Sequence, residues 1–170
     1  MPSKTPSILF GAAVSVALGL AGALLVSRLS LSGQMAVGTA TCLLAFAGPF
    51  LAVRHYVRAS GQPMAVGPGA GLGAVTGVVG GLLTAALQQL LVALDVLPDA
   101  AEAIAAQREQ LVAAGMPPEQ IAEILRIAEA SATAATPFLS VALNGVTGLL
   151  VGALGGALAA ALVKGTRREA

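Results

Sequence analysis

The sequence predicts an all-α membrane protein: a four-helix transmembrane bundle with an extramembrane helical hairpin between the third and fourth spans. The composition supports this class. Of the 170 residues, 56% are hydrophobic and only 10% are charged, and the mean hydropathy is +0.87, whereas an ordinary soluble domain is about 25% charged. A soluble chain of this length leaves too much surface exposed to hide so many apolar side chains. Lipid is therefore the expected solvent for most of the chain.

The positions of the charged residues divide the chain into spans. Four stretches contain no Asp, Glu, Lys or Arg, and each can hold the roughly 20 apolar residues that cross a bilayer. They lie between Lys4 and Arg28, Arg28 and Arg54, Arg58 and Asp95, and Glu129 and Lys164. Within them we predict spans at about 7–27, 35–53, 66–94 and 138–163, and we treat 1–170 as a single integral membrane domain.

The first two spans each carry one ambiguity. The apolar stretch 8–26 is longer than the roughly 7–15 residues of a signal-peptide core, so we expect a retained helix, with cleavage as the alternative. In the second span, Pro49 follows Gly48. A structural kink is expected there, because helices within a membrane tolerate proline.

Basic residues predict the orientation, because cytoplasmic loops collect Lys and Arg. With four spans, six basic residues fall on the side of the two termini and three on the other side. The six are Lys4, Arg54, Arg58, Lys164, Arg167 and Arg168, and the three are Arg28, Arg108 and Arg126. Arg54 and Arg58 are expected in a short loop. We therefore expect a bacterial inner membrane protein with both termini cytoplasmic and 95–137 periplasmic.

The segment 95–137 predicts two helices outside the membrane. Asp99 followed by Glu102 is typical of a capping box that opens a helix, and Gly115 suits its end. Pro118 is well placed in the first turn of a second helix. That helix has one apolar face formed by Ile121, Ile124, Leu125 and Ala128. The hairpin could bind a partner or gate a path, or it could be a lid lying on the bundle or on the membrane surface.

Small residues at a spacing of four predict where the spans pack. Lipid gives apolar helices no hydrophobic reason to associate, so they pair through close contact at small residues. The third span carries Gly69, Gly73, Gly77 and Gly81, the fourth carries Gly148, Gly152 and Gly156, and the first carries Gly11, Ser15, Gly19 and Ala23. We expect most of these ridges to pair within one chain. The ridge of the third span could also serve contact between chains.

Three polar residues within the spans form the candidate site. Gln88 and Gln89 lie near the outer end of the third span, and Asn144 lies at a similar expected depth in the fourth. We expect Asn144 to hydrogen-bond one of the glutamines across the contact between these spans. The functional alternative is that the three residues line a path for a substrate.

Several kinds of chemistry are absent from the sequence. The only histidine, His55, is expected in an exposed loop, and no His, Cys, Asp and Glu pattern predicts a metal site. No carboxylate or basic residue falls within a span, although proton-coupled carriers usually need one. The net charge of +1 gives no sign of nucleic-acid binding. We therefore expect no catalytic residues, no cofactor and no enzyme activity.

A weak internal similarity aligns 11–29 with 69–87. It pairs Gly11 with Gly69 and Gly19 with Gly77. Duplication of a two-span unit would explain it, and chance identity in a chain rich in Gly, Ala and Leu is the rival explanation.

The order of these features resembles a known family. A basic and aromatic segment, His55-Tyr56-Val57-Arg58, precedes a glycine-rich third span. An acidic outer segment with Met116 and Pro117, then Pro137, a glycine-rich fourth span and a basic tail follow. This arrangement resembles the bacterial four-span family known as domain of unknown function 4199. The resemblance implies a membrane topology and transfers no catalytic residue.

These observations favour a small non-enzymatic scaffold or accessory subunit. Its expected partners are the lipid bilayer and either a second copy of the chain or another membrane protein. The alternative is a small channel or carrier with a polar site near Gln88, Gln89 and Asn144. A polar, water-accessible cavity around these residues would favour the alternative, and a tightly packed bundle would favour the accessory role.

Overall fold

The computed structural model describes residues 3–26, 29, 31–134 and 137–165, and the regular structure in these residues is entirely helical. The elements are α1 (Thr5–Val26), α2 (Leu31–Leu44), α3 (Ala47–Ser60), α4 (Val66–Ala93), α5 (Ala100–Ala113), α6 (Pro118–Ala134) and α7 (Pro137–Gly165). The predicted fold class is confirmed. Four helical segments are long and apolar enough to cross a membrane, with α2 and α3 together supplying the second. They are Thr5–Val26, Thr39–Ser60, Val66–Ala93 and Val141–Val163.

The second span is interrupted by a two-residue turn at 45–46, close to the kink predicted at Pro49. Helix α2 ends at Leu44 and α3 begins at Ala47. Pro49 has no N–H to donate to the carbonyl four residues earlier, and its ring clashes with that carbonyl. The pattern of backbone hydrogen bonds therefore changes at the turn between the helices. There the Phe46 N–H donates to the carbonyl of Leu43, three residues earlier rather than four, at 3.4 Å.

The second span also ends later than the predicted limit of residue 53. Helix α3 continues to Ser60 and stops at Gly61, whose φ of 68° lies in the left-handed region. Charged side chains end the apolar pattern at Arg54 without ending the helix. Arg54 and Arg58 therefore lie on α3, and their predicted place in a short loop was wrong. Arg28, Arg167 and Arg168, which also entered the orientation argument, lie outside the described residues.

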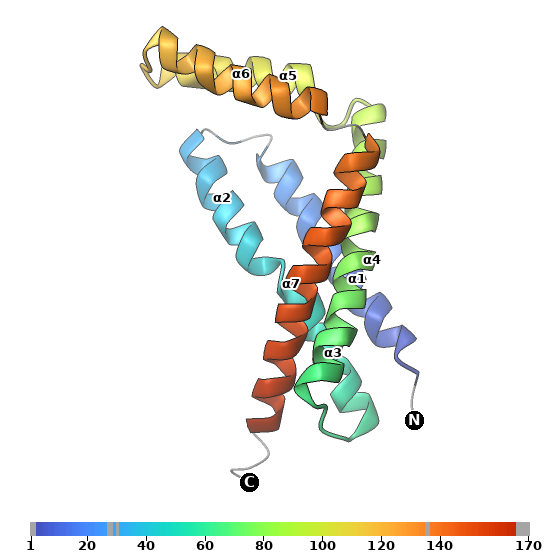
Figure 1. Ribbon diagram of the computed structural model, residues 1–170. Helices are drawn as coiled ribbons and strands as arrows, with labels where there is room; N and C mark the ends of the chain where they lie inside the picture. The colour runs from blue at the N-terminus through green and yellow to red at the C-terminus, as the bar shows by residue number, and fades with distance from the viewer. Residues whose placement is uncertain (1–2, 27–28, 30, 135–136, 166–170) are drawn as a thin grey trace.

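The bundle is organised around the pair α4 and α7, which run antiparallel side by side (Figure 1). Helix α1 packs against α3 and α4, and α3 also packs against α7. The largest group of buried apolar side chains lies where α3, the start of α4 and the end of α7 meet. It contains Val53, Val57, Met64, Leu72, Ala159 and Ala160. Toward the other end of the bundle, α2 diverges from α7 (Figure 1).

The hairpin of α5 and α6 lies across that end of the bundle (Figure 1). The predicted capping box is present, with the Glu102 N–H donating to Asp99 Oδ1 at 2.8 Å and the Asp99 N–H donating to Glu102 Oε2 at 3.2 Å. Gly115 has a φ of 72°, and α6 begins at Pro118 as predicted. The apolar face of α6 packs on α5, which buries Ile121 and Leu111.

Candidate functional site: a cavity beside the glycine interface

The contact between α4 and α7 is made by backbone against backbone. Gly73 faces Gly152, and a methyl group added at Gly73 would come within 2.7 Å of the Gly156 Cα. Gly77 faces Gly148, and a methyl group there would lie 2.9 Å from the Gly152 Cα. The residue numbers of facing pairs add to a constant, which is the register of an antiparallel pair. Such close approach lets many weak dispersion contacts add up where lipid provides no hydrophobic drive.

The glycine ridge of α4 is therefore occupied within the chain. At its two ends, Gly69 faces Gly156 and Ala160, and Gly81 faces the backbone of Asn144. A ridge covered along its length by α7 is not free to bind a second copy. Self-association of this protein would need a different face from the one that the sequence suggested.

The ridge of α1 packs against two helices. A methyl group at Gly11 would lie 2.6 Å from the Gly48 carbonyl oxygen of α3. Further along, the neighbours are side chains, because a methyl group at Gly19 would lie 2.8 Å from Cγ2 of Thr84. Helix α1 therefore meets a backbone carbonyl of α3 at Gly11 and a side chain of α4 at Gly19.

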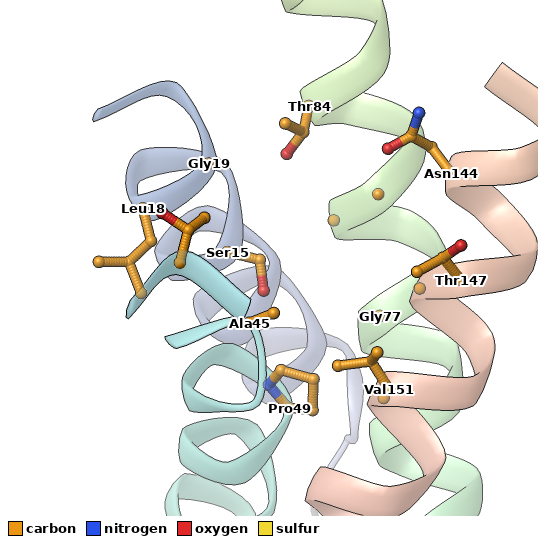
Figure 2. A pocket seen from close by; sticks show the side chains of 15 residues that line it. Ser15, Leu18, Gly19, Ala45, Pro49, Gly77, Thr84, Asn144, Thr147 and Val151 are labelled. Carbon is orange, nitrogen blue, oxygen red and sulfur yellow. The ribbon is translucent and has the colours of Figure 1, made fainter. Parts of the chain in front are cut away.

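A cavity of about 160 Å³ lies where the four spans meet. Thr84 and Asn144 lie at one end of it, and Pro49 and Val151 lie at the other (Figure 2). Its polar side chains come from α1, α2, α4 and α7, and they are Ser15, Thr41, Thr84, Thr147 and Asn144. Glycines of α4 and α7 form much of the remaining wall, together with Leu18 and Ala45. The described lining residues carry no charge.

Two threonine hydroxyls in or beside the cavity wall donate to carbonyls of their own helices. Thr41 Oγ1 donates to the Val37 carbonyl at 2.8 Å, and Thr76 Oγ1 donates to the Leu72 carbonyl at 2.8 Å. A hydroxyl that donates in this way keeps lone pairs that can accept a hydrogen bond. Thr41 can therefore still take part in binding at the cavity wall.

The structure places Asn144 apart from the two glutamines. Asn144 faces Gly81, so Gln88 lies seven residues further along α4, about 10 Å at 1.5 Å per residue. Gln88 and Gln89 instead line a cleft between the end of α1, the end of α4 and α5, beside Gln107 and Gln110. The register of the two helices does not favour the predicted hydrogen bond from Asn144 to a glutamine.

His55 has a partner that sequence reasoning missed. It lies on α3 rather than in a loop, and its side chain is exposed as expected. Its Nδ1 is 2.9 Å from Oγ of the buried Ser7, and its ring stacks on Phe10 with centroids 5.3 Å apart. The two bonded residues are 48 positions apart, and no local pattern links them. In the described part of the chain, no three His, Cys, Asp or Glu residues gather into a group that could hold a metal.

The fold and its four apolar spans define an integral membrane protein. The family model described as protein of unknown function (DUF4199) matches residues 7–165, so the chain belongs to this family. No curated protein and no solved structure matches the chain.

Proposed function

We propose that the protein is a non-enzymatic scaffold or accessory subunit of a bacterial inner membrane, which presents the α5–α6 hairpin to another membrane protein. The observation that carries this proposal is the placement of the hairpin. Its two helices pack mainly on each other, and they lie across the end of the bundle rather than within it (Figure 1). Because α5 and α6 pack mainly on each other, the hairpin has surface outside its contact with the bundle that a partner can bind.

The surface of the hairpin suits a protein partner. Val112 and Ile127 are 59% and 58% exposed, and such apolar side chains commonly form the centre of an interface. The segment 95–137 also contains seven acidic residues, against Arg108 and Arg126. The expected partner therefore offers an apolar patch with basic residues at its rim.

The bundle provides a firm support for this surface. Helix α4 leads into α5, and α6 is followed by α7, so the hairpin is attached to both members of the glycine pair. Because α4 and α7 touch through their backbones, they cannot slide past each other without losing contact along the whole interface. The hairpin is accordingly attached at both ends to helices whose relative position is fixed, α4 and α7.

The orientation can be tested with single cysteines. We propose cytoplasmic termini and a periplasmic hairpin. In a Cys42→Ser background, Glu119→Cys should react with a membrane-impermeant maleimide added to intact spheroplasts, whereas Ser60→Cys at the end of α3 should react only after lysis. The reverse pattern would contradict the orientation.

The partner can be sought by photo-crosslinking in the native membrane. A photoreactive amino acid at Ile127 should give one discrete heterologous product. The same residue at Leu154, which is 64% exposed on the membrane-spanning part of α7, is the matched control and should give mainly lipid adducts. Products at Ile127 restricted to lipid or to the chain itself would contradict the proposal.

A small carrier is the second candidate, and the cavity at Asn144 is the observation that favours it. A carrier must expose this cavity to both sides of the membrane in turn. Thr147→Cys in a Cys42→Ser background would then react with water-soluble maleimides from both sides. Lack of reaction from either side would favour the scaffold.

A further inference from the structure

We propose that the central cavity binds the carbonyl-bearing head of a neutral, tailed membrane molecule, with a quinone ring as the fitting chemical class. The molecule enters sideways from the lipid between α2 and α7. This inference is independent of the proposed scaffold role. It rests on the depth, charge, polarity, size and opening of the cavity.

The depth and charge of the cavity require a neutral ligand. Its α4 residues run from Gly77 to Thr84, close to the middle of a helix that spans Val66–Ala93. No charged side chain lines it among the described residues. An ion placed there would lack a partner of opposite charge, and burying an unpaired ion in hydrocarbon is strongly unfavourable.

The polar lining offers hydrogen-bond donors to a ligand that can accept them. The Asn144 carboxamide has two N–H donors and one carbonyl acceptor, which is more than one neighbour can use. It lies at the same end of the cavity as Thr84 (Figure 2), and Ser15 adds a further hydroxyl. A ring carbonyl fits such donors, and the remaining apolar wall fits the flat faces of the ring.

The size of the cavity limits what can enter. Its volume of about 160 Å³ is close to the roughly 150 Å³ of an engineered protein cavity that binds benzene. Drug-sized ligands occupy sites of about 300–1,000 Å³. The cavity therefore accommodates one ring, and any tail has to lie outside it.

The arrangement of the helices provides the outlet for the tail. Thr41 and Ala45 line the cavity on one side, and Thr147 and Val151 line it on the side of α7. Between these walls, α2 and α7 diverge toward the hairpin end of the molecule (Figure 1). Ala45 lines the cavity and is itself exposed, and Leu43 beside it on α2 is 70% exposed. We therefore place the outlet for an apolar tail at Ala45, on the α2 side of the cavity.

Depth also distinguishes a quinone from a phospholipid. The hydrocarbon core is about 30 Å thick, so the ester carbonyls of a phospholipid lie roughly 15 Å from the middle. The chain ends that reach the middle carry no hydrogen-bonding group. A molecule dissolved within the membrane, with carbonyls on its ring, can bring an acceptor to Asn144 at this depth.

The test is binding of 2-decyl-1,4-benzoquinone to the full-length protein in nanodiscs of synthetic phosphatidylcholine, measured by equilibrium dialysis against empty nanodiscs. We expect about one bound molecule per chain above simple partitioning. Decane and methyl decanoate, which lack the ring, should show no excess binding. Excess binding of methyl decanoate equal to that of 2-decyl-1,4-benzoquinone would overturn the assignment of a ring ligand.

Variants locate the site. Ala45→Phe adds a large side chain at an exposed position of the cavity wall and should abolish the excess binding. Its control is Cys42→Phe, which places the same side chain three residues away at an exposed position outside the cavity and should leave binding unchanged. Asn144→Leu should weaken binding about 3- to 10-fold, the loss of one hydrogen bond within a membrane. Unchanged binding in Ala45→Phe, or no excess binding in the parent protein, would overturn the proposal.

Discussion

The two membrane hairpins of this chain are built differently. In the second, α4 and α7 meet backbone to backbone at the facing glycines between Gly69 and Gly77. In the first, α1 pairs with a broken span, and the pairing changes character at the break. Gly11 meets the backbone of Gly48 on α3. Near α2, a methyl group at Gly22 would instead lie 2.9 Å from the Thr41 hydroxyl oxygen.

This difference shows how one chain combines a fixed pair with an internal cavity. Backbone contact fixes the separation of two helices, because no side chain can rotate to change it. Contact through Thr41 and Thr84 can adjust, because these side chains have other rotamers. The turn before Pro49 divides the first hairpin into two parts, one in which α1 packs on α3 and one in which α1 packs on α2. The cavity lies where the α1–α2 part faces the α4–α7 pair.

The largest expected effect follows from closing the glycine contact with a side chain. Gly77→Ala would drive a methyl group into the backbone of Gly148, and overpacking of this kind costs about 1–3 kcal/mol or more. The free energy of unfolding, measured by steric trapping in bicelles, should fall by this amount. Gly71→Ala is the matched control, because Gly71 lies on the same helix with no atom within 4 Å of the added methyl. Equal losses in the two variants would contradict the account.

A second prediction concerns the extramembrane hairpin of α5 and α6, whose stability can be compared with that of the membrane-spanning helices. Asp99→Ala removes the side-chain acceptor of the capping box at the start of α5, which is worth about 1 kcal/mol. Hydrogen exchange should become faster in the first turn of α5 and stay unchanged in α4 and α7. Faster exchange throughout the bundle would show that hairpin and bundle unfold together. Asp99→Asn, which keeps a capping oxygen, should restore most of the protection.

A smaller effect is expected for the same change of residue on α1, where a side chain of α4 rather than a backbone is the neighbour. Gly19→Ala would bring a methyl group against Cγ2 of Thr84, and that side chain can rotate away. Alanine also raises helix propensity over glycine. Stability by steric trapping should therefore change by less than about 1 kcal/mol. A loss as large as that of Gly77→Ala would contradict the contrast between helix contacts made by backbone and helix contacts made by side chains.

The smallest effect is expected at Thr41. Its hydroxyl donates to its own helix at Val37, so it makes no bond that holds two spans together. Thr41→Val should change the free energy of unfolding by at most about 0.5 kcal/mol, as for a position without a critical contact. A large loss would mean that this hydroxyl bonds across the cavity, and the cavity would then be narrower than described.

Local signals in the sequence predicted much of this structure. Stretches without charged residues predicted the spans, because a charged side chain is unfavourable in the hydrocarbon core of a membrane. Asp99, Glu102, Gly115 and Pro118 predicted the hairpin, because caps and turns depend on residues a few positions apart. The spacing of glycines predicted which faces were smooth enough for close packing.

Features that depend on register were not predictable in this way. Asn144 faces Gly81 because of how two distant helices slide together, and depth counted from the ends of the spans placed it beside Gln88 instead. The contact of His55 with Ser7 joins two helices without any local pattern. The cavity likewise arises from a divergence of α2 and α7 that no single segment encodes.

The most direct test of the central claim is a pair of distance measurements in lipid bilayers by double electron–electron resonance between nitroxide spin labels. One label on the native Cys42 and one at Leu150→Cys report on α2 and α7. Labels at Leu83→Cys and Leu150→Cys, in a Cys42→Ser background, report on α4 and α7. We predict a narrow distance distribution for α4 and α7 and a clearly broader one for α2 and α7. Equally narrow distributions would contradict the claim that one hairpin is fixed by its backbone contacts and the other is open.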